Sequence, residues 1–221
     1  MSGVHEPAVD IAVPLTPPYR IETERLVIRC YDPRDAALLK EAVDSSLEHL
    51  RPWMPWAQFE PQTLEEKVEL LRGFRGRFDL DQEYAYGVFA RDESRLLGGS
   101  GLHRRAEDGS LEIGYFIRAD AIRQGLATEV TAVLTRVGFD FCDLDRVEIK
   151  VDPENLPSLG VPRKLGFTEE AVLRGVLPPK RKGGTSRDAI LFTMLAGELA
   201  ASSAAGFAYD AFDAVGEPLE A

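Results

Sequence analysis

The sequence predicts an α/β protein with one mixed, mostly antiparallel sheet of about seven strands and helices on its faces. Two patterns indicate this class. Stretches that alternate apolar and polar residues, typical of strands, are interleaved with stretches whose apolar residues recur every three or four positions, typical of helices. Three expected strands also follow one another across short loops, which favours antiparallel neighbours over a regular doubly wound sheet.

The first half of the chain predicts a strand, two helices and three strands. Residues 24–31 (ERLVIRCY) alternate enough for a strand, and Asp32-Pro33 then supplies an N-cap and a first-turn proline for a helix. Thr63 and Glu66 form a capping box for a second helix, although Gly73 and Gly76 weaken its later turns. The next strands are expected at residues 84–90, 96–103 and 111–117.

The second half predicts helix, strand, helix and two strands. One apolar face runs through residues 124–141, which makes this the clearest helix of the chain. Alternating residues then predict a strand at 146–151, and a helix over 155–165 is expected to stop at Gly166. The last strands are expected at residues 167–173 and 187–195.

With 221 residues, 44% of them hydrophobic, the chain fits one globular domain. We expect a proline-rich arm over residues 1–18, the domain over 19–199 and a tail over 200–221. The tail is either disordered or a short segment that docks on a neighbour, and the sequence does not choose.

Charge and cysteine content narrow the class of protein. The net charge of −11 opposes binding to nucleic acid and suits a cationic acceptor such as an amine. No apolar run is long enough to cross a membrane and the start lacks a secretory pattern, so we expect a cytoplasmic protein. Cys30 and Cys142 are expected to be reduced thiols, and no metal site is indicated.

The start of the long helix is a candidate phosphate site. Backbone N–H groups are unpaired at a helix N-terminus, and Gly125 and the small Ala127 in RQGLATE would let a ligand approach them. Thr128 adds a hydroxyl and Arg123 a charge. The same residues also suit an ordinary helix start, so a second element is needed.

That element lies downstream. ENLPSLGVPRKLGF, residues 154–167, resembles the N-x-x-S-x-x-V-x-x-K-L-G-F segment of the GNAT superfamily of N-acyltransferases. RQGLATE resembles the pyrophosphate loop of that superfamily, and LEIGYFI resembles the strand before it. ETERLVIR and LRPWMPW are similar to the Rim-type ribosomal-protein alanine N-acetyltransferases, and the resemblance covers about residues 19–199.

The resemblance implies acetyl-CoA or another acyl-CoA in a cleft between the strands at residues 111–118 and 146–151. An amide near Ile117 would polarise the thioester carbonyl. The residues expected to contact coenzyme A are Phe116, Ile117, Arg118, Arg123, Gln124, Gly125, Leu126, Ala127, Thr128, Asn155 and Ser158.

The resemblance also implies direct attack of an amine on the thioester. Ser158 is the candidate donor to the sulfur, and Asn155 would order the cofactor or the acceptor, unless Ser158 is merely solvated and Asn155 only caps its helix. Glu112 is the candidate base, with attraction of the cationic acceptor as its alternative role. Trp53 and Trp56 look like walls of the acceptor pocket, although such residues are usually core.

Several points stay open at this stage. His103 is a candidate acceptor contact or a structural residue. Ile122 and Arg123 depart from the loop pattern, and Pro162 could kink the helix that carries Ser158. The acceptor is a small-molecule amine or a protein N-terminus, and a homodimer is expected. A CoA-binding module without catalysis is the main alternative, while a dinucleotide site is disfavoured because the third glycine is missing.

Overall fold

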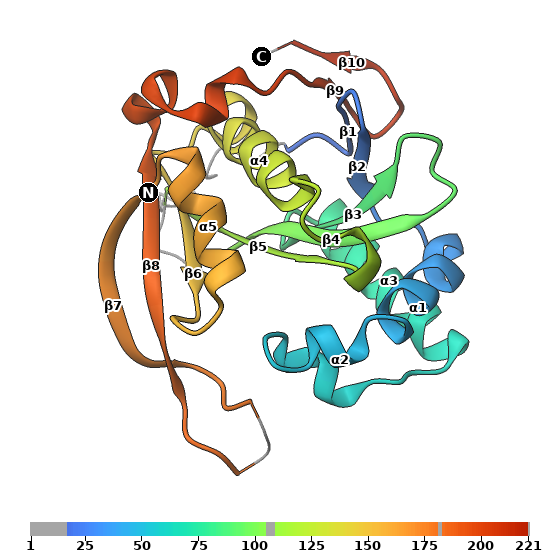
Figure 1. The fold of residues 1–221 in the computed structure, drawn as a ribbon. Coiled ribbons are helices and arrows are strands. Elements are labelled where there is room, and N and C mark those ends of the chain that lie inside the picture. Colours follow the sequence, from blue (N-terminus) through green and yellow to red (C-terminus); the bar gives the residue numbers. More distant parts are fainter. Residues whose placement is uncertain (1–16, 105–108, 181–182, 221) are drawn as a thin grey trace, which may run out of the picture.

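The computed structural model describes residues 17–104, 109–180 and 183–220, and these form one ten-stranded sheet with helices on both faces (Figure 1). The strand order is β10-β9-β1-β2-β3-β4-β5-β6-β8-β7. The strands are β1 Arg20–Glu22, β2 Leu26–Cys30, β3 Tyr84–Ala90, β4 Leu96–His103, β5 Ser110–Ile117, β6 Arg146–Val151, β7 Thr168–Leu177, β8 Arg187–Leu195, β9 Asp210–Phe212 and β10 Pro218–Leu219. The seven strands expected from the sequence are β2 to β8.

The one parallel pair among the described strands is β5 with β6, and it comes apart soon after it begins. Ser110, Leu111 and Glu112 pair with Arg146, Val147 and Glu148, and no pairing with β6 follows. β5 nevertheless stays paired with β4 as far as Ile117. The last five residues of β5 therefore have an edge without a strand partner, and Figure 1 shows β5 turning away from β6 there.

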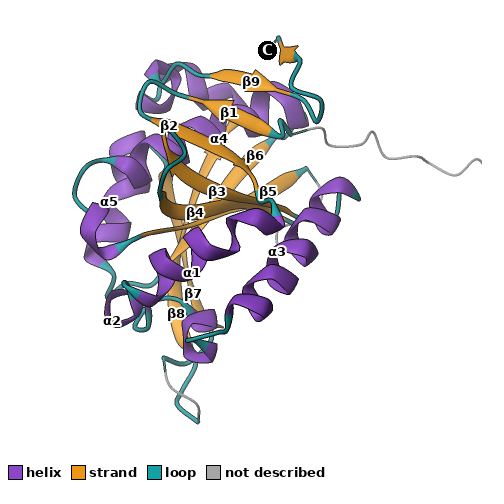
Figure 2. Ribbon diagram, turned by 90° about the vertical axis from the view of Figure 1, so that its right-hand side faces the viewer, coloured by secondary structure: helices purple, strands orange, loops and turns teal. Residues whose placement is uncertain are grey.

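Two helical layers cover the sheet (Figure 2). α1 Ala36–Asp44 and α3 Leu64–Asp79 pack on one face over Val27, Phe89 and Leu96. α4 Leu126–Cys142 and α5 Leu156–Leu165 lie on the other, where their apolar residues share a core with the inner strands. The short α2 Leu47–Leu50 follows α1 on the first face.

Local sequence signals explain most helix boundaries. Asp32 and Asp35 form a capping box around a 3-10 turn, Pro33–Asp35, that leads into α1. The expected Thr63–Glu66 box starts α3, which continues through both of its glycines because buried Leu71 and Phe78 hold it to the sheet. Gly166 ends α5 in the left-handed conformation, as expected.

The C-terminal residues dock on the domain itself. β9 pairs with β1, and the hydroxyl of Tyr209 donates to Asp140 Oδ2 of α4 at 2.7 Å. The sequence did not decide whether residues 200–221 are disordered or docked on a neighbour. The structure places this segment beside β1 in the same sheet. The expected arm lies outside the described residues except for Pro17 and Pro18, whose side chains are buried.

Candidate active site

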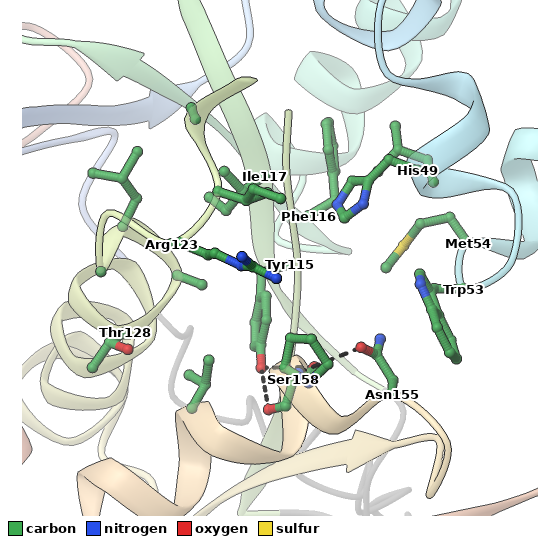
Figure 3. Close-up of a pocket in the computed structure, with 18 of the residues that line it drawn as sticks. His49, Trp53, Met54, Tyr115, Phe116, Ile117, Arg123, Thr128, Asn155 and Ser158 are labelled. Atoms are coloured by element: carbon green, nitrogen blue, oxygen red, sulfur yellow. Dashed lines mark hydrogen bonds between the residues drawn. The ribbon is translucent and has the colours of Figure 1, made fainter. Parts of the chain in front are cut away.

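A cavity of about 580 Å³ opens where β5 and β6 separate. Residues from the end of β5, the loop before α4, the start of α5 and the α2 region line it. Figure 3 shows His49, Met54 and Trp53 on one wall, Arg123 and Thr128 opposite, and Tyr115 between them. No Asp or Glu of the described chain is among the lining residues.

The end of β5 turns a backbone donor toward this cavity. The N–H of Arg118 donates to Leu97 O at 2.9 Å, on the β4 side. Because successive N–H groups of a strand point to opposite sides, the N–H of Ile117 points to the unpaired edge. Ile117 lines the cavity, so its N–H can bind a carbonyl oxygen held there.

The N-terminus of α4 forms a second part of the cavity wall. Gly125 is the N-cap with a φ of +79°, and Arg123 before it also has a positive φ of +61°. No side chain caps the helix, which leaves the first N–H groups open to an anion. Arg123 and Lys164 add positive charge to the same cavity, which suits a phosphate ligand.

An ion pair to the N-terminal strand region holds this loop in place. Glu129 is buried and accepts hydrogen bonds from Thr23 Oγ1 at 2.6 Å and Arg25 Nε at 2.8 Å. Arg25 Nη1 also donates to the carbonyl of Gln124 at 3.0 Å, directly before Gly125. Thr23, Arg25 and Glu129 thus fix the conformation that exposes the helix N–H groups, and sequence reasoning missed all three.

Ser158 lies in the first turn of α5 and meets Tyr115 of β5 in the cavity. Their hydroxyl oxygens are 3.0 Å apart, and the Tyr115 hydroxyl also donates to the Ser158 carbonyl oxygen at 3.2 Å. Burial raises the pKa of Tyr115 to about 12, although its contact with Ser158 opposes that shift. The phenol therefore stays protonated at neutral pH and acts as a donor.

Pro162 explains why this pairing is available. In a regular helix the N–H of residue 162 would bind the carbonyl of Ser158, and proline has no N–H. α5 runs on to Leu165, and the carbonyl that Pro162 leaves unpaired accepts from Tyr115 instead. The proline does not interrupt the helix that carries Ser158.

Asn155 caps its helix and also lies at the cavity, so the structure is compatible with both roles expected for it. It is the N-cap of α5, where its Oδ1 accepts from the N–H of Ser158 at 3.4 Å, and it lines the cavity. Capping uses the side-chain oxygen, so the amide NH₂ is left to meet a ligand.

The comparison with protein families identifies the fold. The family model described as "Acetyltransferase (GNAT) domain" matches residues 25–168. The chain belongs to the GNAT acetyltransferase family. The mixed sheet whose parallel pair separates is the GNAT fold.

Relatives and solved structures agree with this assignment. The uncharacterized N-acetyltransferase YoaA of Bacillus subtilis is 26% identical over 79% of this chain and 96% of its own. The ribosomal protein uS5-alanine N-acetyltransferase of Escherichia coli is 24% identical over 73% of this chain and 84% of its own. The structure of Mycobacterium smegmatis RimJ in complex with CoA-disulfide has a TM-score of 0.70 at 25% identity, covering 86% of this chain and 91% of that one.

In this GNAT acetyltransferase most of the expected coenzyme A contacts lie at the cavity. Phe116, Ile117, Arg123, Gly125, Leu126, Ala127, Thr128, Asn155 and Ser158 all line it. Arg118 and Gln124 do not: the Arg118 side chain is buried and pairs with Glu41 and Asp120, and the Gln124 carbonyl binds Arg25.

The expected acceptor residues divide in the same way. Trp53 lines the cavity, and Lys180 Nζ lies 4.5 Å from the centre of its ring. Trp56 packs edge-on against Phe116 with ring centres 5.3 Å apart, outside the lining. His103 also lies outside the lining, and its Nδ1 is 2.8 Å from Glu83 Oε1.

Glu112 occupies the same face of β5 as Phe116 but lies four residues earlier. At about 3.3 Å per residue this is roughly 13 Å along the strand. Its carboxylate accepts from Lys150 Nζ at 2.9 Å, is nearly buried, and does not line the cavity. Its role as base remains a prediction.

Sequence reasoning did not assign Tyr115 and His49 to the site. Tyr115 shares its strand face with the buried Ile113 and Ile117, and a phenol on such a face needs a polar partner, which is a usable signal. His49 stands four residues before Trp53, and only the fold shows that both line one cavity.

Within the described residues no helix is long and apolar enough to cross a bilayer. Cys30 and Cys142 are both free and buried, as expected from their spacing.

Proposed function

We propose that this acetyl-CoA-dependent N-acetyltransferase acetylates the α-amino group of a protein or peptide. One observation carries the proposal: a single cavity joins the open N-terminus of α4, the N–H of Ile117, the Ser158 hydroxyl and the Trp53 wall. The helix N-terminus suits the pyrophosphate of coenzyme A, Ile117 and Ser158 suit the thioester, and the Trp53 wall suits the acceptor.

Coenzyme A would lie between the separated strands. The N–H groups at the start of α4, with Arg123 and Lys164, would bind its phosphates. The pantetheine arm would run along the free edge of β5, and the N–H of Ile117 would bind the thioester carbonyl oxygen. That N–H becomes a stronger partner as negative charge develops on this oxygen during attack.

The reaction is a direct transfer. The neutral amine attacks the thioester carbon, an N–C bond forms, and the C–S bond breaks. The ammonium loses one proton to a base, and the departing sulfur takes one from Ser158, whose hydroxyl Tyr115 orients. Asn155 would hold the pantetheine arm or the acceptor beside Ser158.

One property of the cavity and one relative support an N-terminal acceptor. Its acceptor side includes the apolar side chains of Trp53, Met54 and Phe116, which suit a peptide backbone and small side chain more than a polycation. The relative from Escherichia coli is named for acetylation of an alanine of ribosomal protein uS5. We further propose that the enzyme acts in the cytoplasm and forms a homodimer. Its molar mass in solution tests the dimer.

An assay of thiol release from acetyl-CoA tests the proposal with a panel of amines. The panel contains peptides with free and with blocked N-termini, an Nα-blocked lysine peptide and a polyamine. Turnover with free N-termini, lost on blocking them, is the expected result. Calorimetry should also detect acetyl-CoA binding at micromolar concentration, around −8 kcal/mol. Binding without turnover on any amine would favour a CoA-binding module instead.

A further inference from the structure

None of the described residues brings a carboxylate to the cavity lining, although the reaction requires a proton acceptor for the amine. Among the described lining residues, the ionisable groups are His49, Tyr115, Arg123 and Lys164. Guanidinium and ammonium groups stay protonated near pH 7, and burial raises the pKa of Tyr115 to about 12. Within the described lining, the imidazole of His49 is thus the one side chain of a type that ordinarily accepts a proton near neutrality.

His49 is held close to the end of β5. The segment that carries it begins where Ser46 Oγ accepts from the N–H of Ala119 at 2.9 Å, two residues after Ile117. It ends where the Trp56 ring packs on Phe116. His49 lies between these two contacts on α2, so the segment is fixed against the strand end on both sides.

The ring of His49 is directed into the cavity (Figure 3). No described residue forms a hydrogen bond or ion pair with it. The other charged groups of the cavity lining are Arg123 from the loop before α4 and Lys164 from α5. The Arg118–Glu41 ion pair joins the end of β5 to α1, the helix before the one that carries His49. Glu48 and Arg51 flank it on its own segment and are exposed.

We propose that His49 is the base that removes the proton from the attacking amine. This inference rests on the proposed function and names its proton acceptor. The bound ammonium first passes one proton to the imidazole and then attacks as the neutral amine. As the N–C bond forms and the C–S bond breaks, Ser158 gives its proton to the sulfur and is reprotonated by the second proton that leaves the nitrogen, and the imidazolium returns its proton to solvent.

An imidazole base also selects the class of amine. Imidazoles ordinarily titrate at about 6.5, α-amino groups at about 8 and lysine side chains at about 10.4. An α-ammonium can therefore lose its proton to an imidazole at little cost in free energy, whereas for a lysine ammonium the same transfer is about two pKa units less favourable. We expect a preference of roughly 100-fold for a free N-terminus over a lysine side chain at pH 7.

The test compares His49→Gln with wild type in kcat/KM from pH 6 to 9.5, using a peptide with a free N-terminus. The variant should lose about 100-fold at pH 7. The gap should shrink at least tenfold by pH 9.5, because the amine is then neutral without a base. Coenzyme A binding by calorimetry should match wild type, and Glu48→Gln, a neighbour outside the cavity, should behave as wild type.

Three results would overturn the inference. His49→Gln could keep activity within threefold of wild type, its deficit could be independent of pH, or Glu112→Gln could remove the pH-dependent limb while His49→Gln retains it. In each case wild type still turns over, so the acetyltransferase proposal stands. If wild type itself transfers no acetyl group to any amine, the proposed function fails and His49 loses this role with it.

Discussion

The hydroxyl of Tyr115 lies 3.0 Å from the hydroxyl of Ser158, and it also donates to the Ser158 carbonyl at 3.2 Å. Three features of the chain produce this contact. β5 aims the phenol at α5, Asn155 caps the helix, and Pro162 leaves the carbonyl without its helical partner. The contact fixes the rotamer of the side chain proposed to protonate the leaving sulfur.

Ser158→Ala should lower kcat about 100-fold with little change in KM for acetyl-CoA, because the sulfur would depart without a proton donor. Tyr115→Phe should lower kcat only several-fold, since Ser158 remains but loses its orienting partner. Steady-state thiol release measures both. Equal losses in the two variants, or a loss confined to KM, would contradict the assigned roles.

Gly125→Ala should weaken coenzyme A binding and destabilise the fold. The left-handed conformation at Gly125 costs a residue with a Cβ about 1 kcal/mol, and relieving it would turn the open N–H groups away. Denaturant unfolding and calorimetry measure the two effects. Gly160→Ala is the control: this helical glycine has open space around it, so alanine there should stabilise by up to about 1 kcal/mol.

Glu129→Ala should lower the free energy of unfolding by about 2 kcal/mol, because the buried acceptor of Thr23 and Arg25 disappears. It should also weaken coenzyme A binding several-fold, since Arg25 then no longer holds the Gln124 carbonyl in place. Arg72→Ala removes an exposed pair with Glu69 and should change stability by less than about 0.5 kcal/mol. Unaltered coenzyme A affinity in Glu129→Ala would show that the pair does not support the loop.

The protein should lose stability at alkaline pH. Burial raises the pKa of all six tyrosines, and those of Tyr19, Tyr84 and Tyr115 to about 12. Unfolded tyrosines ionise near 10, so above that pH the unfolded state releases more protons than the native state. The stabilisation is complete below about pH 10 and is lost as pH rises through about 12.

Absorbance of tyrosinate measures this directly. At pH 10.5 the native protein should show almost no ionised tyrosine. The same protein unfolded in about 6 M guanidinium chloride should show most of its tyrosines ionised. A native titration that follows the unfolded one would contradict the buried environments described above.

The sequence predicted the helix boundaries and strands that depend on residues close together in the chain. The Thr63–Glu66 box, the glycine stop at Gly166 and the alternation in β3 to β6 each depend on residues close in the chain. β1 and β9 were not predicted, because strands of three residues acquire their structure from pairing across nearly the whole chain.

The site residues differ in the same way: those in local motifs were predicted, and those that act through distant partners were not. The glycine loop and Ser158 lie in motifs that the sequence displays, and they line the cavity. Tyr115, Arg25 and His49 function through partners far away in the chain: Arg25 and Glu129, for example, are separated by 104 positions. Spacing does not reveal such contacts, and Glu112 illustrates the converse, since a suitable residue on the expected strand lies outside the cavity.

The central claim is that acetyl-CoA lies between the separated ends of β5 and β6. A crystal structure of the protein with coenzyme A tests it most directly. We predict pyrophosphate oxygens at the N–H groups that begin α4 and the thiol beside Ser158 and Ile117. A nucleotide bound elsewhere, with this cavity filled by side chains, would contradict the account.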